Sequence, residues 1–334
     1  MKKMVEGLKH YPGVHCCSTS VRDIVNFHGH ELSEAMCFGL ASGLGFTYWK
    51  DDKVSPSRCM AGRAEWIAPQ FFQNIGMPFT WEVQKEFPWP EMKKYLDNDV
   101  PILLLTDIYY LEYYGSSTHF AGHCVVLAGY DEEHETVFLG DTDREGWQTA
   151  SLASLEKAMN SVALPVSIQN YWQPFPKVEI ASIESAIVTA LMRQYKQMQH
   201  PSQPIVGLTG MQHFVKDLKN WSKEAADLDW CLRFSYQVIE KRGTGGGNFR
   251  LIYSSFLEEA HQYFPGSTLD DAAAEMKEIA ALWTELAYVF KELSESFTAK
   301  QLENAIALSR NVCSREKDFY LRLSHICENL SGLE

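Results

Sequence analysis

The sequence has no C-x-x-C pair, no long apolar run and fewer basic than acidic residues, and each shortage excludes a class of protein. Without cysteines at metal-ligand spacing, a structural zinc site is not expected. No stretch approaches the roughly eighteen uninterrupted apolar residues of a transmembrane helix. The net charge is −13, from 30 lysines and arginines against 43 acids. This balance argues against binding to nucleic acid or to an anionic membrane, since both need a cationic face.

An export signal is also missing from the start of the chain. Met1-Lys-Lys begins like one, but residues 5–10 hold no apolar core and Pro12 follows soon after. We therefore expect a cytoplasmic protein. In such a chain the cysteines are expected to be free thiols, most of them buried as small apolar residues. The eight cysteines are at positions 16, 17, 37, 59, 124, 231, 313 and 327.

The hydrophobic pattern changes near residue 176. Before it, helical pieces at 16–28, 63–74, 88–96 and after Ser33 alternate with buried strands predicted at 43–49, 102–106, 124–130 and 136–139. This alternation is typical of an α+β domain. After it, apolar stripes at helical spacing predict helices over 183–198, 211–224, 228–241, 249–263, 269–294 and 299–330. We expect two domains, residues 1–176 (α+β) and 177–334 (all-α).

A thiol follows a turn near the start of the chain. Tyr11-Pro-Gly-Val-His-Cys-Cys-Ser-Thr-Ser20 runs directly into the helix predicted at 16–28. Unpaired N–H groups and the helix dipole at a helix start favour an anion, and the thiolate is the nucleophilic form of cysteine. Only one of Cys16 and Cys17 can face a cleft from that turn, and the spacing does not separate them.

A histidine and an aspartate lie further along in the order that a cysteine nucleophile requires. His123 precedes a buried strand, and Asp141 ends the next one. A hairpin turn centred near residue 132 sets the two almost opposite each other across the ladder. Asp143 is the alternative acid if the hairpin slips by two residues. His119 is the alternative base, although it lies in a polar loop with no comparable partner in the sequence.

A glycine-rich segment, Gly243-Thr-Gly-Gly-Gly-Asn-Phe-Arg250, separates two predicted helices. It lacks the Gly-Lys-Ser/Thr of a P-loop and the strand that precedes a dinucleotide-binding loop. Two interpretations stay open. The segment is a flexible connection, or the backbone N–H groups of Gly245 and Gly246, with Arg250, bind an anion such as a phosphate or carboxylate.

Several short motifs together resemble a known family. They are His15-Cys16 with Ser18-Thr19, Leu32-Ser-Glu34, Phe38-Gly-Leu40, Gly43-Leu-Gly-Phe46, Tyr48-Trp49, Gly122-His123 and Asp141-Thr142. The set resembles the N-terminal domain of butirosin biosynthesis protein H. The second half, with Ile239–Arg250 and Phe256–Ala260, is similar to the uncharacterised helical domain often fused behind it.

The resemblance implies a papain-like (cysteine-peptidase-like) fold and acyltransferase activity. The family's namesake moves an aminoacyl group from an acyl carrier protein thioester to an amine of an aminoglycoside. Aligning the family's His-Cys pair with His15-Cys16 selects Cys16 as the nucleophile. Cys17, Glu34 and Tyr48 are then candidates for substrate binding, although Glu34 is most simply an acid in the first turn of a helix. The oxyanion glutamine of papain-like enzymes is absent, since His10 and Tyr11 stand in its place.

We therefore expect a cysteine-dependent acyltransferase of antibiotic or other secondary-metabolite biosynthesis, with Cys16, His123 and Asp141 as its triad. The acyl donor would be a thioester on the phosphopantetheine of an acyl carrier protein, or on coenzyme A, and the acceptor a small amine. No other cofactor and no metal is expected. An acidic carrier protein would need a basic docking patch, for which Arg58 and Arg63 are candidates.

Two alternatives use the same fold. One is a cysteine hydrolase (a thioesterase, amidase or peptidase) that admits water to the same triad. The other is a catalytically silent papain-like module that binds a metabolite or a partner. Closure of the helical domain over the cleft would favour the transferase, because it would exclude water. The sequence does not indicate an oligomeric state.

Overall fold

The computed structural model describes residues 1–163 and 166–331, which form two compact units. Unit 1 combines Met1–Cys37 with Gly76–Ala181, and unit 2 combines Phe38–Ile75 with the chain from Ser182 onward. The structure therefore divides the chain differently from the predicted domains 1–176 and 177–334. An early segment of 38 residues, Phe38–Ile75, belongs with the helices that follow residue 181.

Unit 1 is built on an antiparallel sheet. The strand order is β4-β9-β5-β6-β7-β8, and β1 pairs with β6. Val125, Val126 and Leu127 of the central strand β6 are completely buried. The strands are β1 (Lys2–Met4), β4 (Glu82–Val83), β5 (Ile102–Asp107), β6 (Ala121–Asp131), β7 (Thr136–Gly140), β8 (Gln148–Ser151) and β9 (Tyr171–Pro174).

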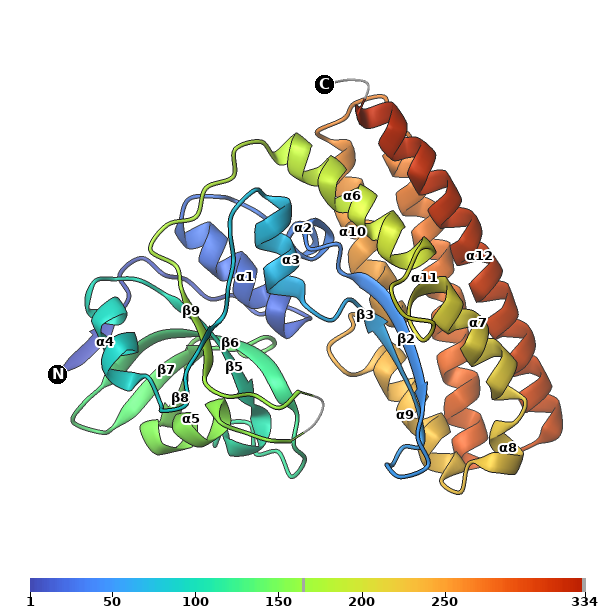
Figure 1. Cartoon of the computed structure of the whole chain (residues 1–334), viewed down its shortest axis with the longest axis horizontal. Coiled ribbons are helices and arrows are strands. Elements are labelled where there is room, and N and C mark those ends of the chain that lie inside the picture. The colour runs from blue at the N-terminus through green and yellow to red at the C-terminus, as the bar shows by residue number, and fades with distance from the viewer. Residues whose placement is uncertain (164–165, 332–334) are drawn as a thin grey trace. The chain divides into compact units, whose positions relative to one another are not determined.

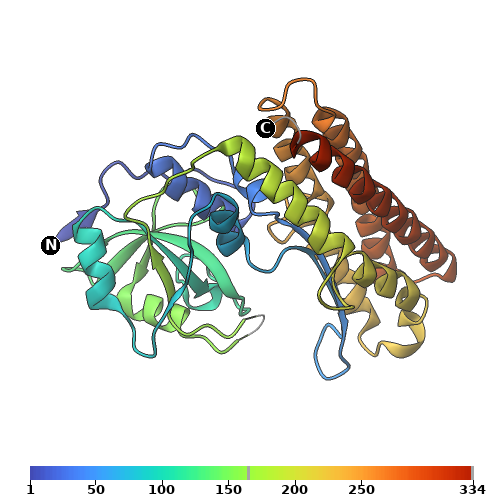
Figure 2. The same cartoon turned by 45° about the horizontal axis from the view of Figure 1, so that its top comes forward.

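Helices cover both faces of this sheet. Helix α1 (Cys16–Phe27) packs against β6, with Val21, Ile24 and Val25 fully buried. Figures 1 and 2 show α1 on one face and α5 on the other. The remaining elements of unit 1 are α4 (Trp89–Asp97), α5 (Leu152–Met159) and a short 3-10 helix, η1 (Ile108–Tyr110), while α2 (Glu34–Leu40) spans the boundary between the units.

Unit 2 is a helical assembly with one β-hairpin. Its β2 strand contacts α7 and its β3 strand contacts α9, and the long helices α11 and α12 pack along each other (Figure 1). Aromatic rings join the hairpin to the helices, because Phe46 lies against Trp283 and Tyr48 against Trp221. The elements are β2 (Leu44–Lys50), β3 (Arg58–Arg63), α3 (Ile67–Asn74), α6 (Ile183–Gln199), α7 (Gly207–Leu218), α8 (Trp221–Glu224), α9 (Leu228–Glu240), η2 (Gly247–Phe249), α10 (Arg250–His261), α11 (Leu269–Glu295) and α12 (Ala299–Ser331).

The expected mixture of helices and strands, followed by a helical C-terminal region, is confirmed. Two predicted helices are wrong in part. The helix expected over 211–224 is divided, because α7 ends at Leu218 and α8 begins at Trp221. Residues 63–74 were expected to be one helix, but Arg63 ends β3 and the helix begins only at Ile67. Pro69 is tolerated in the first turn of α3 because its missing N–H has no intrahelical partner there. The β3 strand escaped prediction because Arg-Cys-Met-Ala-Gly-Arg contains no β-branched or aromatic residue.

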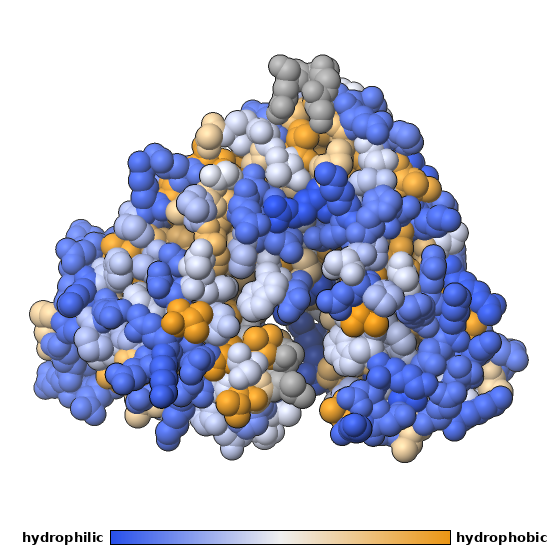
Figure 3. Space-filling view, in the orientation of Figure 1, coloured by the Kyte–Doolittle hydropathy of each residue, from blue (hydrophilic) through white to orange (hydrophobic). Residues whose placement is uncertain are grey.

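Among the residues described, no helix combines the length and the apolar character needed to cross a membrane. Figure 3 shows hydrophilic residues over most of the visible face, with hydrophobic ones scattered singly or in small groups.

Candidate functional site

The turn before α1 brings Cys16 to the first position of that helix. His15 is the N-cap residue, and its ring accepts a hydrogen bond from the Ser18 N–H at 3.4 Å. The turn needs a glycine at position 13, because an added Cβ would lie 2.1 Å from Thr19 Oγ1 and 2.6 Å from Glu34 Oε2. The sequence Pro12-Gly13 thus sets the path by which the thiol reaches the helix start.

Glu34 holds this turn in place through hydrogen bonds. Its carboxylate accepts the backbone N–H groups of Val14 (2.9 Å) and His15 (2.8 Å). It also accepts the hydroxyls of Ser18 (3.0 Å) and Thr19 (3.1 Å). Both carboxylate oxygens are therefore used inside the protein, and Glu34 positions the start of α1.

His123 enters β6 directly after Gly122, whose positive φ of +95° suits glycine. The ring is buried, and its Nε2 donates to Asp141 Oδ1 at 2.7 Å. The Cys16 thiol lies within hydrogen-bonding reach of the same ring. Since Asp141 occupies Nε2, Nδ1 is the nitrogen left for the thiol.

Asp141 follows the last residue of β7 and is completely buried. The ladder pairs Val126 with Gly140, which brings the carboxylate alongside the start of β6. Asp141 also accepts the Tyr113 hydroxyl at 2.6 Å and the Thr142 hydroxyl at 3.0 Å. The alternative acid, Asp143, has a side chain that is 72% exposed and lies beside Arg144, so the ring of His123 is oriented by Asp141.

Electrostatics at this site favour a charged imidazole. Burial alone would lower the pKa of His123. The charge and hydrogen bond of Asp141 outweigh it, and Cys16 adds to them, so the pKa of His123 is raised well above its ordinary value. For Asp141, burial opposes ionisation, but the nearby His123 and the two hydroxyls hold the pKa of this carboxyl below its usual range.

Cys17 points elsewhere. Its thiol lies against Cys124 of β6, a completely buried side chain whose pKa is raised by burial and by the contact with Cys17. The Ser20 hydroxyl of the same helix donates to the Cys124 carbonyl at 3.4 Å. The structure therefore places one thiol of the pair against the sheet and the other against His123, a distinction that spacing did not provide.

A second buried network, which sequence reasoning missed, braces the turn. His10 Nδ1 pairs with Asp23 Oδ2 at 2.5 Å, and its Nε2 donates to the Arg144 carbonyl at 3.0 Å. Arg22 binds Asp23 and the carbonyl of Tyr11. Because both ring nitrogens of His10 are engaged, this histidine does not replace the absent oxyanion glutamine. A signal was present in the sequence, since the charged pair Arg22-Asp23 lies between the apolar residues Val21 and Ile24.

The aromatic segment after η1 also contributes to the site. Tyr113 holds Asp141, and the Tyr114 ring meets the His123 ring edge-on at a centroid distance of 5.5 Å. The expectation that His119 has no partner is wrong. Its Nδ1 lies 2.7 Å from Oδ2 of Asp107, a buried carboxylate at the end of β5. The contacts of Tyr113 with Asp141 and of His119 with Asp107 could not be found from local sequence, because each joins residues from different segments.

The structure gives residues of the glycine-rich segment hydrogen-bond partners inside the protein. The Gly246 N–H donates to Thr244 Oγ1 at 3.0 Å, so this donor is used within the loop. Arg250 is fully buried and pairs with Glu316 through Nε at 2.8 Å and through Nη2 at 2.9 Å. Gly245 and Gly246 both have positive φ, so the glycines serve a tight connection between α9 and α10.

Two further predicted residues have structural partners in unit 2. Tyr48, a substrate-binding candidate, is buried and donates to Asp217 at 2.6 Å. Burial and the Asp217 carboxylate raise the pKa of its phenol. Arg58, offered for a docking patch, is fully buried and paired with Asp52 at 2.5 Å. Within residues 1–163 and 166–331, no group of three or more His, Cys, Asp or Glu side chains is placed to bind a metal ion.

Comparison with known families gives two adjacent matches. Residues 15–142 match the family model described as Butirosin biosynthesis protein H, N-terminal, and residues 153–323 match Domain of unknown function (DUF4872). A search of the curated proteins gave no match. The first match runs from His15 to Thr142 and so contains Cys16, His123 and Asp141, which confirms the resemblance predicted from the motifs. The second covers just over half of the chain, and the chain thus belongs to the family of this domain, with the match to the butirosin biosynthesis protein H N-terminal model in front of it.

Proposed function

We propose that the chain is a cysteine-dependent acyltransferase whose first unit has a papain-like arrangement. One observation carries the proposal. A single buried imidazole, His123, faces the Cys16 thiol and donates to Asp141 at 2.7 Å. A thiol at a helix start, a histidine at the beginning of a strand and a carboxylate that orients the histidine are the parts that nucleophilic cysteine catalysis requires.

In the first half-reaction the proton of Cys16 passes to Nδ1 of His123. The thiolate then attacks the carbonyl carbon of a thioester. Backbone N–H groups at the first turn of α1, where Cys16 lies, would stabilise the developing oxyanion. When the tetrahedral intermediate collapses, His123 returns the proton to the departing thiol, and an acyl-Cys16 thioester remains. Asp141 keeps the ring in place and stabilises its charged form throughout.

In the second half-reaction an amine attacks the acyl-Cys16 carbonyl. His123 takes the proton from the amine nitrogen, the C–S bond breaks, and the amide leaves the enzyme. Exchange between two thioesters is nearly balanced in free energy, whereas conversion of a thioester to an amide runs downhill. A cysteine nucleophile therefore suits this transfer.

The family description supports a place in antibiotic biosynthesis. We propose a small amine as acceptor and, as donor, a thioester carried on the phosphopantetheine of an acyl carrier protein or on coenzyme A. No further cofactor is needed for either half-reaction, since the atoms and charges balance among thiol, imidazole and substrates.

Intact-protein mass spectrometry tests the proposal. Wild-type protein incubated with an acyl thioester should gain the mass of one acyl group, and the C17A variant should gain it too, because Cys17 faces the sheet. C16A should gain none. An amide formed on adding amines indicates a transferase, and free acid alone indicates a thioesterase. Acylation of C16A at the wild-type rate would defeat the proposal.

A further inference from the structure

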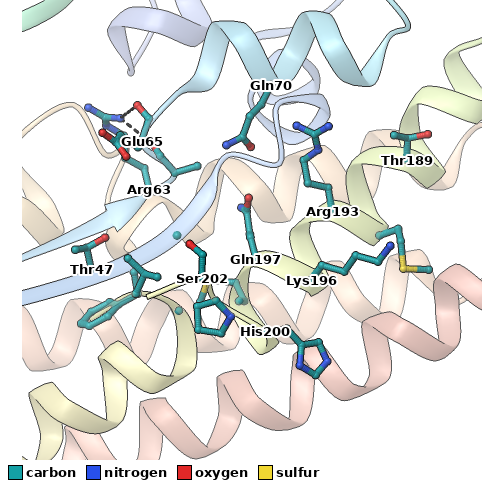
Figure 4. A pocket seen from close by; sticks show the side chains of 18 of the residues that line it. Thr47, Arg63, Glu65, Gln70, Thr189, Arg193, Lys196, Gln197, His200 and Ser202 are labelled. Carbon is teal, nitrogen blue, oxygen red and sulfur yellow. Dashed lines mark hydrogen bonds between the residues drawn. The ribbon is translucent and has the colours of Figure 1, made fainter. Parts of the chain in front are cut away.

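Unit 2 contains a pocket of about 760 Å³ that carries positive charge. Arg63 from the end of β3 and Arg193 and Lys196 from α6 line it, while Glu65 is the one acid among its lining residues. Figure 4 shows these side chains together with polar groups from α3, α6 and the segment after it. Such a cluster is unexpected in a chain of net charge −13, and the volume is in the usual range for small-molecule sites.

The arginines of this pocket are held by neutral groups. Arg63 Nη1 donates to the backbone carbonyls of Ala64 (2.8 Å) and Glu65 (3.2 Å). Arg193 Nη1 donates to the side-chain oxygen of Gln73 at 3.0 Å. In the part of the chain that the structure describes, no carboxylate lies within ion-pair distance of Arg63, Arg193 or Lys196. Hydrogen bonds therefore hold the two guanidinium groups in place, but no carboxylate among the described residues neutralises the three positive charges.

Other arginines in the same unit show the contrast. Arg58 is paired with Asp52, and Arg250 is paired with Glu316. Burial lowers the pKa of Arg193, and no carboxylate offsets that cost. An uncompensated, partly buried guanidinium is stabilised when an anion binds beside it.

The remaining lining residues indicate what else such an anion carries. The side-chain oxygen of Gln70 is buried without a hydrogen-bond partner, so it can accept from a ligand hydroxyl or amide. Phe46, Met192 and Val206 give the pocket an apolar wall. The site thus suits a molecule with a strong anion at one end and an organic part with hydrogen-bond donors at the other.

We propose that this pocket binds an organic phosphate, with the phosphate group held by Arg193 and Lys196 of α6 and the organic part lying along Phe46 and Met192, while Arg63 lies on the other side of the pocket beside Glu65 (Figure 4). The two positive charges of Arg193 and Lys196 match a phosphate dianion better than a single carboxylate, and the planar guanidinium can bind two phosphate oxygens at once. The inference concerns unit 2 alone and does not depend on chemistry at Cys16.

Isothermal titration calorimetry on the full chain tests this inference with three probes. 4′-Phosphopantetheine and pantetheine share one chain and differ by one phosphate, while ADP carries phosphate on a different organic group. We expect saturable binding of at least one phosphate probe, with pantetheine at least about ten-fold weaker than 4′-phosphopantetheine. Binding should weaken as ionic strength rises.

Variants locate the site. R193Q/K196Q should weaken phosphate binding by about ten-fold or more, and R193K should retain part of it because the charge remains. The matched control R310Q/K277Q removes the same charges from exposed positions on α12 and α11 and should bind normally. C16A should also bind normally, which separates this site from the proposed acyl transfer.

Three results would overturn the inference. One is the absence of binding of both phosphate probes at about 1 mM. Another is measurable binding of both 4′-phosphopantetheine and pantetheine with equal affinity. The third is unchanged affinity in R193Q/K196Q when its thermal unfolding shows a folded protein.

Discussion

Asp141 is the residue on which the electrostatics of the site depend. Its charge raises the pKa of His123 and so favours a thiolate–imidazolium pair with Cys16. In D141N that charge is lost, the pKa of His123 falls and the thiol holds its proton to higher pH. We expect the rate of Cys16 alkylation by iodoacetamide to fall at least ten-fold near pH 6, with its pH midpoint shifted upward. The rate is measured by intact mass across pH 5 to 9.

The neighbouring acid provides a matched control for this experiment. Asp143 is exposed and lies beside Arg144, so D143N should label like wild type at every pH. Equal pH profiles for D141N and wild type would mean that the carboxylate does not control the thiol.

Tyr113 contributes through Asp141. In Y113F the buried Oδ2 of Asp141 loses its 2.6 Å donor, so the pKa of Asp141 should rise and stability should fall by about 1–3 kcal/mol. The stability that depends on ionised Asp141 is present above the ordinary aspartate pKa and is lost as pH falls. Urea unfolding should show a similar loss from pH 7 down to the ordinary aspartate pKa, and the loss should become smaller as the pH falls below that value. Y109F, at a half-exposed ring, should change stability little.

For single residues, the sequence predicted the contact between side chains of one hairpin and missed contacts between side chains of separate segments. His123 and Asp141 lie on consecutive strands, so the turn position was enough to bring them together. The contacts from Tyr113 to Asp141 and from His119 to Asp107 join a loop to strand ends. No local periodicity encodes such contacts.

Among the elements, the start of α10 is joined to its surroundings by a buried ion pair. Arg250 binds Glu316 of α12 and the carbonyl of Gly62 in β3 at 2.8 Å. R250M leaves the Glu316 carboxylate buried, so we expect a loss of about 3–5 kcal/mol in urea unfolding. The double variant R250M/E316M should recover part of this loss, because no unpaired charge remains. A double variant less stable than R250M would contradict this expectation and show that Glu316 stabilises the fold through other contacts, such as the hydrogen bond from Trp283 Nε1 at 2.6 Å.

Elements with a strong apolar period were predicted within a few residues, whereas short polar strands were not. The 3.6-residue pattern gives α11 and α12 over 269–294 and 299–330, against observed helices Leu269–Glu295 and Ala299–Ser331. The strand β8, Gln-Thr-Ala-Ser, has no apolar alternation and pairs with β7 through its backbone. Its position is set by its neighbour and not by its own side chains.

For the whole molecule, the unexpected result is that the hairpin of β2 and β3 belongs to unit 2. The rings of Phe46 and Tyr48 complete the core around Trp283, Phe214 and Trp221. Sequence separation hid this packing, because the hairpin and the helices are more than 100 residues apart. Composition alone grouped the hairpin with the α+β region that surrounds it in the sequence.

A fragment with the predicted boundaries should therefore fold poorly. Residues 177–334 alone lack β2 and β3, and their removal exposes the aromatic core of unit 2. We expect weak near-ultraviolet circular dichroism and broad, non-cooperative thermal unfolding. The same fragment with residues 38–75 attached through a flexible linker should regain a sharp transition. A cooperative transition in the shorter fragment would show that the hairpin is dispensable.

Because unit 2 is formed by two separate segments of the chain, its parts are synthesised at different times on the ribosome. Residues 38–75 are synthesised about a hundred positions before the first helix they pack against. At bacterial or eukaryotic elongation rates that interval is roughly 5 to 20 s. Throughout it Phe46 and Tyr48, which are almost fully buried in the finished protein, have no core to enter. The nascent chain must keep this hairpin from aggregating until the later helices emerge, which makes it a natural substrate for a holding chaperone.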